Sequence, residues 1–162
     1  VYYTFGNHER WVDENDLKMP GIYILNSKTA KFREVVIGGL RSGFTGQHET
    51  CINKTPKPDI EFLDRFERFS APKLLLCHHP EYYEEYLRSR NIDLIFAGHA
   101  HGGQWRFFGR GVFAPGQGIF PKYTSGLIDE RMIVSRGLAN TVKLPRLFNE
   151  TELVIADIEP KI

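Results

Sequence analysis

The stretch KLLLCHHPEYYEEYLRSRNIDLIFAGHAHGG, residues 73–103, decides how this sequence folds. It contains two short apolar runs, at 73–77 and 93–97, that have the length and composition of buried strands. Between them, residues 81–90 have a helical composition, with glutamates first and arginines last, as the helix dipole favours. A helix of about ten residues between two buried strands is typical of a parallel β-α-β unit. Both strands are therefore expected to end at the same edge of one sheet.

Histidines follow both of these strands directly. His78 follows the first strand, and His99 and His101 follow the second within the segment GHAHGG at 98–103. Ligands of open α/β sheets bind outside the carboxyl ends of the strands, so we expect the three imidazoles to meet there. Residues two apart in an extended segment face the same way, which lets His99 and His101 reach one small volume. Because an isolated His-x-His also occurs in loops, this pair alone leaves a metal-binding role and an incidental role open.

The opening segment VYYTFGNHE, residues 1–9, has a similar arrangement. Residues 1–5 are aromatic and β-branched, and they indicate a third buried strand that ends at Gly6. Asn7 offers a carbonyl oxygen to a divalent ion, and His8 is a candidate general acid, since imidazole serves that role near neutral pH. A helix-capping or solvent-exposed histidine is the alternative for His8. Three apolar strands that each end in metal-capable residues favour a shared site.

The rest of the sequence predicts an α/β (α+β) architecture around these strands. Residues 59–69 have apolar positions at helical spacing after Asp59, a favourable N-cap, and residues 10–17 are compatible with a short helix. Residues 41–58 have no period and many breakers, which predicts a surface loop, and residues 27–31 indicate a polar turn. Further strands are expected at 21–26, 33–40, 103–108, 123–129, 131–136 and 153–158.

The bulk composition limits the class of protein. A chain of 162 residues is enough for one ordinary domain. The net charge of +1 gives no sign of a nucleic-acid-binding surface, and no apolar run is long enough for a transmembrane segment. Cys51 and Cys77 are isolated, and we expect both to be reduced thiols. Because the sequence starts in an apolar strand and without methionine, we expect a fragment whose upstream part is missing.

Three segments, in this order, resemble the later motifs of the calcineurin-like metallophosphoesterase family. They are GNHE at 6–9, LLCHHP at 75–80 and GHAHGGQ at 98–104. The last motif and the downstream stretches FAPGQGIFPKYTSG, MIVSRGL, PRLFN and ELVIADIE are similar to a bacterial branch with the signature GHxHGGQ. The resemblance covers nearly the whole chain. It implies a mixed-sheet β-sandwich flanked by helices, present here as a partial fold in a single domain, 1–162.

The resemblance also implies a dinuclear centre of divalent metal ions, either manganese, zinc or iron. In that family the position of Asn7 binds one ion, as do the positions of His78 and His99. The position of His101 binds the other ion, and that of His8 protonates the leaving group. The implied activity is hydrolysis of a phosphomonoester or phosphodiester by a water that two metal ions activate.

The sequence departs from the family pattern at its start. Two earlier motifs, an Asp-x-His and a Gly-Asp with the bridging carboxylate, are absent, and we expect them upstream of Val1. Without that carboxylate, two cations roughly 3.5 Å apart repel each other, so this chain alone should bind at most one ion, weakly, and remain inactive. An open sheet face would favour a dimer, a swapped assembly or aggregation. A missing segment leaves both a cytoplasmic and a membrane-associated location open.

Other candidates complete the sequence-based picture. Arg136 and Arg146 lie in the branch-like segments and could bind the phosphate of a substrate, since the guanidinium fork pairs with phosphate; surface salt bridges are the alternative. His79 is expected either behind the metal ligands or at the surface. A non-catalytic metal-binding or scaffold module derived from the family is a rival function. A structural zinc site is a weaker rival, because the sequence has no cysteine-rich shell.

Overall fold

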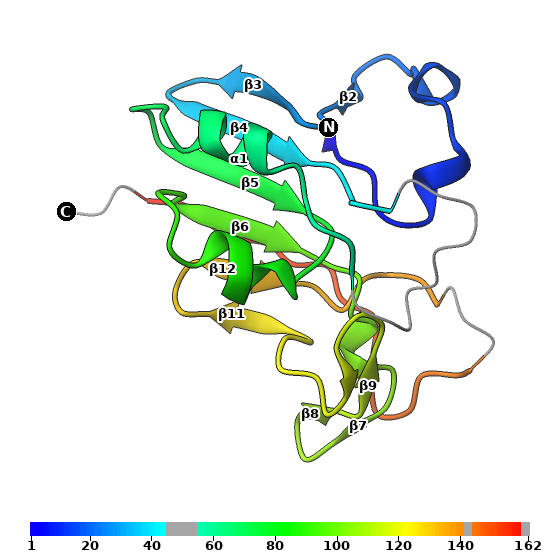
Figure 1. Ribbon diagram of the computed structural model, residues 1–162. Helices are drawn as coiled ribbons and strands as arrows, with labels where there is room; N and C mark the ends of the chain where they lie inside the picture. Colours follow the sequence, from blue (N-terminus) through cyan, green and yellow to red (C-terminus); the bar gives the residue numbers. More distant parts are fainter. Residues whose placement is uncertain (45–54, 141–143, 160–162) are drawn as a thin grey trace.

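The computed structural model describes residues 1–44, 55–140 and 144–159, and its central element is a six-stranded mixed sheet (Figure 1). The order across the sheet is β11-β12-β6-β5-β4-β3. The strands span β3 Lys28–Phe32, β4 Val35–Leu40, β5 Lys73–Cys77, β6 Leu94–Ala97, β11 Gly126–Ile128 and β12 Met132–Val134. The predicted α+β class with a mixed sheet is confirmed.

The four central strands, β4, β5, β6 and β12, run parallel to one another. The edge strands β3 and β11 run antiparallel to their neighbours. Leu75 of β5 is paired with Ile95 of β6, which confirms the parallel unit predicted for residues 73–97. The arrowheads of β4, β5 and β6 accordingly point the same way in Figure 1, and the segments that follow these strands leave the sheet at one edge.

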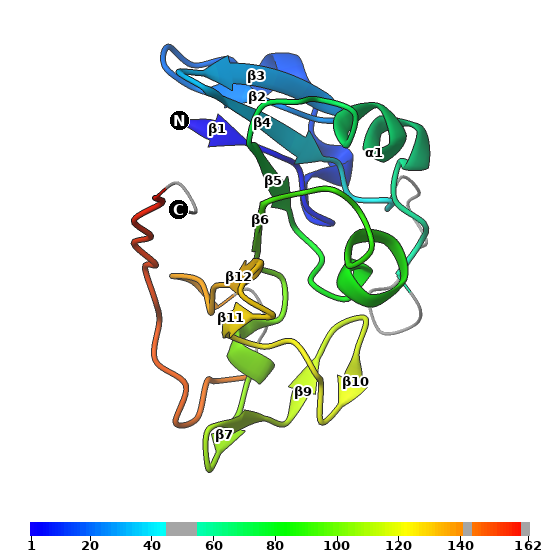
Figure 2. The ribbon, with the colours of Figure 1, turned by 90° about the vertical axis from the view of Figure 1, so that its left-hand side faces the viewer.

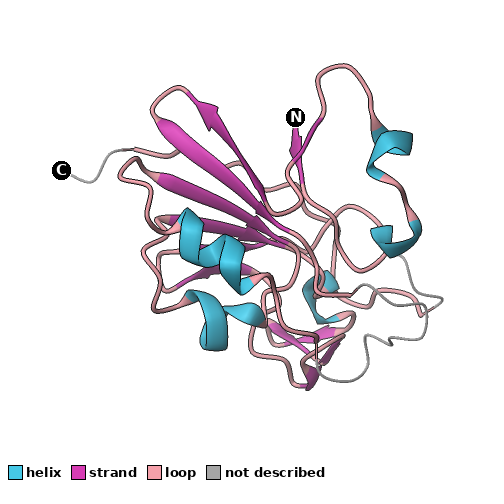
Figure 3. Cartoon of the chain, turned by 45° about the horizontal axis from the view of Figure 1, so that its top comes forward, coloured by secondary structure: helices cyan, strands magenta, loops and turns pink. Residues whose placement is uncertain are grey.

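Two helical segments cover one face of the sheet (Figures 2 and 3). Helix α1 spans Ile60–Phe66, and the side chain of Asp59 accepts a hydrogen bond of 2.9 Å from the N–H of Phe62. The predicted N-cap is confirmed, but the helix ends three residues before the predicted end at 69. A single π-helical turn, Tyr83–Leu87, takes the place of the helix predicted for 81–90.

The hydrophobic core lies between these helical segments and the sheet. Alternate residues of each strand face it: along β5, Leu75 and Cys77 are buried, whereas Leu74 and Leu76 are only partly buried. The side chains that fill this layer include Phe62, Leu63, Phe66, Tyr82, Tyr83, Leu87, Ile95 and Met132. Burial of these apolar side chains fixes the sheet and therefore the edge at which the histidines emerge.

On the opposite face of the sheet, β4 is covered by other parts of the chain, whereas β5, β6 and β12 border an open groove. Strands β1 Tyr2–Tyr3 and β2 Tyr23–Ile24 form a parallel pair. The chain after β2 packs directly on β4, since a Cβ on Gly39 would lie 2.0 Å from the carbonyl oxygen of Leu25. Over β5, β6 and β12, a groove of about 420 Å³ runs between β1 and residues 152–154. Its floor is formed by Leu76, Phe96 and Ile133.

Several other local predictions are also wrong. Residues 28–31 belong to strand β3 instead of a turn, because an exposed edge strand needs no apolar face. Residues 10–17 contribute to two 3₁₀ turns, Glu9–Trp11 and Glu14–Leu17, which bury no residue and so have no packing to extend them. Residues 153–158 are apolar but form no strand, since they have no strand partner in the described part of the chain.

Short elements follow the last histidine. The 3₁₀ turn His101–Gly103 leads to two small antiparallel pairs, which replace the strand predicted for 103–108. These pairs are β7 Arg106–Phe107 with β8 Arg110–Gly111, and β9 Phe113–Ala114 with β10 Gly118–Ile119. Within the described ranges, no helix has both the length and the apolar character needed to cross a membrane. Cys77 is a buried free thiol, whereas Cys51 and most of the predicted loop 41–58 lie outside the described residues.

Candidate metal centre

The ends of β1, β4, β5 and β6 are held together by backbone hydrogen bonds. The N–H of Ser42, after β4, donates to the carbonyl of Phe5, after β1, at 3.1 Å. The N–H of Gly98, after β6, donates to the carbonyl of His78, after β5, at 3.2 Å. The polar residues that follow these strands therefore emerge side by side, as the β-α-β argument predicts.

Asn7, His78 and His99 come together at this edge. Nε2 of His78 lies 2.8 Å from Oδ1 of Asn7 and 3.1 Å from Nδ1 of His99. The three residues come from segments separated by 71 and 21 positions in the sequence. Nε2 of His78 thus has an amide oxygen on one side and a second imidazole nitrogen on another, at spacings that occur between the ligands of a single divalent cation.

Burial keeps these imidazoles neutral. It lowers the pKa of His78 well below the ordinary value, and the nearby rings of His79, His8 and His101 lower it further. Burial also lowers the pKa of His99 to about 2. A neutral imidazole has an available lone pair on one of its ring nitrogens. This neutral form is the one that binds metal ions. The electrostatics of the site therefore favour the ligand form of both side chains.

Local geometry supports the position of His78. A Cβ on Gly6 would lie 2.7 Å from the His78 ring, so only glycine lets β1 approach this closely. His99 and His101 both have a positive φ, 60° and 49°, which costs a non-glycine residue on the order of 1 kcal/mol. The side chain of Asn149 offsets this strain by donating to the carbonyls of His101 and Gln104 at 2.6 and 3.0 Å.

His101 and His8 lie at the periphery of this group. Nδ1 of His101 is 3.3 Å from Nη2 of Arg146, and both burial and this guanidinium lower the pKa of His101. His8 is exposed at the start of the turn Glu9–Trp11, and its side chain makes no capping hydrogen bond. Of the alternative roles for His8, helix capping is therefore wrong, whereas a solvent-exposed position agrees with the structure. His8 lies close enough to lower the pKa of both His78 and His101.

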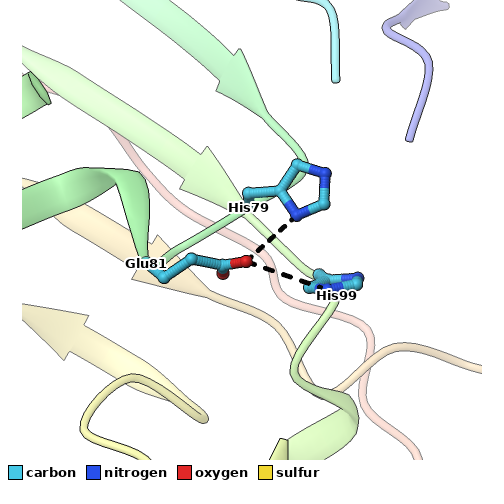
Figure 4. A group of neighbouring side chains, drawn as sticks. All are labelled: His79, Glu81 and His99. Atoms are coloured by element: carbon cyan, nitrogen blue, oxygen red, sulfur yellow. Dashed lines mark hydrogen bonds and ion pairs between the residues drawn. The ribbon is translucent and has the colours of Figure 1, made fainter. Parts of the chain in front are cut away.

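Sequence reasoning missed a second cluster behind the first, formed by His79, Glu81 and His99 (Figure 4). His79 is fully buried, so the surface alternative for it is wrong. Nε2 of His79 lies 2.7 Å from Oγ of Ser42, and its Nδ1 lies 3.2 Å from Oε1 of Glu81. Oε1 of Glu81 also lies 3.9 Å from Nε2 of His99.

The alternation of the strand could have revealed the burial of His79. His78 continues the series Leu74 and Leu76, which faces β1, whereas His79 continues Leu75 and Cys77, which face the helical segments. Consecutive histidines on a strand point to opposite faces. His79 was thus assignable to the interior, although its partner Glu81 has no comparable signal in the sequence.

The two arginines have different surroundings. Nε of Arg136 lies 3.5 Å from Oε2 of Glu152, which is the salt bridge named as the alternative. Nη2 of Arg146 donates to the carbonyls of Arg136 and Ala139 at 2.8 and 2.6 Å. Nε and Nη1 of Arg146 are buried and have no hydrogen-bond partner within the described ranges. The N–H groups at these two nitrogens are therefore available to bind an anion beside His101.

Comparisons with known proteins show the family of this chain. The sequence model of the calcineurin-like phosphoesterases matches residues 1–103, and the chain belongs to that family. One relative is YpbG of Bacillus subtilis strain 168, described as an uncharacterized protein, which is 33% identical over 90 residues. That match covers 55% of this chain and 32% of YpbG, so it spans about a third of that relative's length. No solved structure matches the chain.

Proposed function

We propose that this protein is a metal-dependent phosphoesterase whose ion site includes Asn7, His78 and His99. The observation that carries the proposal is that Nε2 of His78 lies 2.8 Å from Oδ1 of Asn7 and 3.1 Å from Nδ1 of His99, in a chain of the calcineurin-like phosphoesterase family. Phosphomonoesters and phosphodiesters are the substrate class that the family supports.

The donor set favours manganese, zinc or iron. Two imidazole nitrogens and one amide oxygen suit these borderline ions better than calcium or magnesium, which prefer oxygen ligands. Bound at this edge, such ions would lower the pKa of a water molecule and neutralise charge on the phosphoryl group. Cys77 is no alternative ligand, because burial raises the pKa of its thiol to about 12 and its Sγ donates to the carbonyl of His79.

We assign the remaining steps to His8, Arg146 and His101. His8, exposed beside the site, would donate a proton to the departing alkoxide. Arg146 would bind a phosphoryl oxygen through its buried and unpartnered Nε and Nη1. His101 would hold a second ion. Arg136 remains a weaker candidate for substrate binding, since Glu152 already accompanies it.

This chain alone would hold one ion and not two. Among the described residues, the family positions give the first ion Asn7, His78 and His99, but give the second only His101. Two cations that share no carboxylate repel each other strongly in a partly buried site. We therefore propose weak binding of a single ion and no turnover by the 162-residue chain on its own. The shortage of ligands for the second ion also supports the alternative of a non-catalytic metal-binding or scaffold module.

We also propose that the isolated chain associates with a second copy of itself. The groove over β5, β6 and β12 has an apolar floor, and Leu138 and Leu153 beside it are 67% and 74% exposed. Contiguous apolar surface of this kind favours self-association in water.

Calorimetric titration of the metal-free chain with Zn²⁺, Mn²⁺ or Co²⁺ tests the ion site. We expect one equivalent of at least one of these ions to bind, and Asn7→Ala and His78→Ala to weaken its binding by at least roughly 10-fold. The exposed Asn91→Ala is the matched control. Binding that both site variants leave unchanged would refute the assignment of these ligands.

An assay with bis(p-nitrophenyl) phosphate and p-nitrophenyl phosphate tests the function. The complete gene product should hydrolyse at least one ester in a metal-dependent manner, whereas the 162-residue chain should not. A metal-loaded gene product that hydrolyses no phosphoester would favour the non-catalytic alternative. Equal activity of the two would refute the proposed inactivity of the chain.

A further inference from the structure

The carboxylate of Glu81 lies behind the candidate ion site. Its Oε1 faces the rings of both His79 and His99, whose centroids lie 4.4 Å apart (Figure 4). Nδ1 of His99 faces His78, whereas Nε2, on the other side of the same ring, faces Glu81 at 3.9 Å. The side chain of Glu81 is only 13% exposed, so water screens its charge weakly.

Hydrogen bonding fixes the tautomer of His79. An ionised carboxylate only accepts hydrogen bonds, so Nδ1 of His79 carries the proton that is donated to Glu81. Nε2 of this neutral ring then accepts from the hydroxyl of Ser42, whose Oγ in turn accepts from the N–H of Phe44 at 3.3 Å. Each group in this series of hydrogen bonds therefore either donates or accepts at a defined atom. The carboxylate of Glu81 sets the direction in which the protons are donated.

The same reasoning applies to His99. Its Nε2 and Oε2 of Glu81 are both buried and have no hydrogen-bond partner within the described ranges. A buried donor and a buried acceptor without partners are costly. Nε2 of His99 lies 3.9 Å from Oε1 of the same carboxylate, so a shift of about 1 Å would bring the ring and the carboxylate into hydrogen-bond distance. With the proton on Nε2, the lone pair of His99 is on Nδ1, directed at His78 and the ion site.

We propose that Glu81 is a positioning residue that holds His99 as its Nε2–H tautomer and thereby aims the Nδ1 lone pair at the ion bound by Asn7 and His78. This inference rests on the proposed function. Carboxylates that accept from the outer N–H of a metal-binding histidine commonly orient the ring and raise its basicity.

The surroundings of Glu81 fit such a role. The hydroxyl of Thr55 donates to Oε1, and a Cβ on Gly116 would lie 2.3 Å from the same oxygen. The loop around Gly116 therefore closes over the carboxylate. A carboxylate held in this way has few other orientations, which is what precise orientation of an imidazole requires.

Direct ligation by Glu81 is the competing arrangement. Ligand atoms of His79, Glu81 and His99 lie within 4.8 Å of one another, so an ion could fit between them. This would need the proton of His79 to move from Nδ1 to Nε2, so that Nε2 would donate to the hydroxyl of Ser42 in place of accepting from it. The observed series of hydrogen bonds from Phe44 through Ser42 and His79 to Glu81 therefore favours a role of Glu81 in positioning His99. Direct ligation by Glu81 is one outcome of the test below.

The test uses Co²⁺ and the 162-residue chain, in the forms wild type, Glu81→Gln and Glu85→Gln. Glu85 is an exposed carboxylate of the same segment and serves as the matched control. Affinity is read from the visible absorption of Co²⁺, and the ¹⁵N shifts of the histidine rings report the tautomer of His99 without metal. We expect Glu81→Gln to weaken Co²⁺ binding by roughly 10- to 100-fold and to reduce the Nε2–H population of His99.

The outcomes separate this inference from the proposed function. An unchanged affinity and an unchanged tautomer in Glu81→Gln overturn the positioning role and leave the ion site standing. Complete loss of binding, with the Nδ1 resonance of His79 shifted by Co²⁺ in the wild type, overturns it in favour of ligation. If the wild type binds no ion but Glu81→Gln still changes the tautomer of His99, the positioning role holds and the proposed function fails.

Thr55→Val provides a second variant in case Glu81→Gln does not fold. It keeps the carboxylate and removes one hydrogen bond that orients it. We expect a weaker effect in the same direction, on the order of 3- to 10-fold in Co²⁺ affinity. A folded Thr55→Val with the wild-type affinity and the wild-type His99 tautomer contradicts the proposal.

Discussion

Nδ1 of His99 lies 3.1 Å from Nε2 of His78, although 21 residues separate them in the sequence. The parallel pairing of Cys77 with Ala97 produces this proximity, because the two histidines follow these paired residues at the ends of adjacent strands. Two neutral rings at this distance can be joined by one proton or by one metal ion. The sheet register therefore determines the geometry of the candidate ion site.

Gly6→Ala should disturb this geometry without touching a ligand. The new Cβ would lie 2.7 Å from the ring of His78, so the ring must move away from Asn7. We expect the affinity for Zn²⁺ or Co²⁺ to fall by roughly 10-fold, because ligand orientation is lost. Isothermal titration calorimetry measures the change, and circular dichroism verifies the fold.

Gly98→Ala is the matched control for that substitution. Gly98 lies in the same site, but a Cβ there would have no atom within 4 Å. Its ion affinity should stay within about 2-fold of the wild type. Equal losses in the two variants would show that the contact between Gly6 and His78 does not control the site.

Ser42→Ala should destabilise the metal-free protein. It removes the hydroxyl that lies 2.7 Å from Nε2 of His79 and leaves a buried nitrogen without a partner. The expected cost is about 1–3 kcal/mol in the free energy of unfolding. Urea denaturation measures it, with the exposed Ser70→Ala as control. A loss no larger than that of Ser70→Ala would show that this hydrogen bond contributes little.

The histidine edge was predictable from the sequence because a single physical rule produces it. Buried strands separated by one helical segment pair in parallel, and their ends coincide. This rule placed His78 near His99 before any coordinates were known. The position of Asn7 followed from the buried strand predicted at 1–5, although β1 spans only Tyr2–Tyr3, is partly buried, and pairs with β2 and not with the central sheet.

The contacts that depend on loops were not predictable in the same way. Glu81 reaches His99 only because the chain turns after Pro80, and Thr55 meets Glu81 across 26 residues. Neither contact has a periodic signal. The exposed strand β3 was missed because its sequence, which includes Lys28 and Lys31, has no alternating apolar pattern. Only the backbone hydrogen bonds to β4 define this strand.

Self-association of the 162-residue chain should depend on the open sheet face. Leu138→Lys and Leu153→Lys place charges beside the apolar groove, at side chains that are 67% and 74% exposed. We expect sedimentation velocity to show a concentration-dependent dimer or larger species for the wild type, and weaker association for both variants. Phe120→Lys, 77% exposed and not in that groove, is the control. A wild type that is monomeric at all concentrations would contradict the prediction.

Stability of the metal-free protein should fall steeply as the pH drops below 6.5. Burial lowers the pKa of His79 to about 3 and that of His99 to about 2, and His78 is also well below the ordinary value of 6.5. At about pH 7.5 and above, these rings are almost entirely neutral in both the folded and unfolded states and contribute little pH dependence. Between 6.5 and the folded pKa values, only the unfolded chain binds protons, so acid favours unfolding.

The slope of this dependence identifies the histidines responsible. Each buried ring contributes about 1.4 kcal/mol per pH unit, so the three together contribute about 4 kcal/mol per unit, against a total stability of roughly 5–15 kcal/mol. Urea midpoints measured in EDTA at pH 7.5, about 6.5 and about 5.5 should therefore fall slightly between the first two values, which corresponds to about 1 kcal/mol for three rings, and much more steeply between the second and the third. Replacing one ring, as in His79→Gln, should lower the slope by about a third even though the variant is less stable. A slope that is unchanged in His79→Gln would mean that the ring already binds its proton in the folded protein, and a neutral interior cluster would then be untenable.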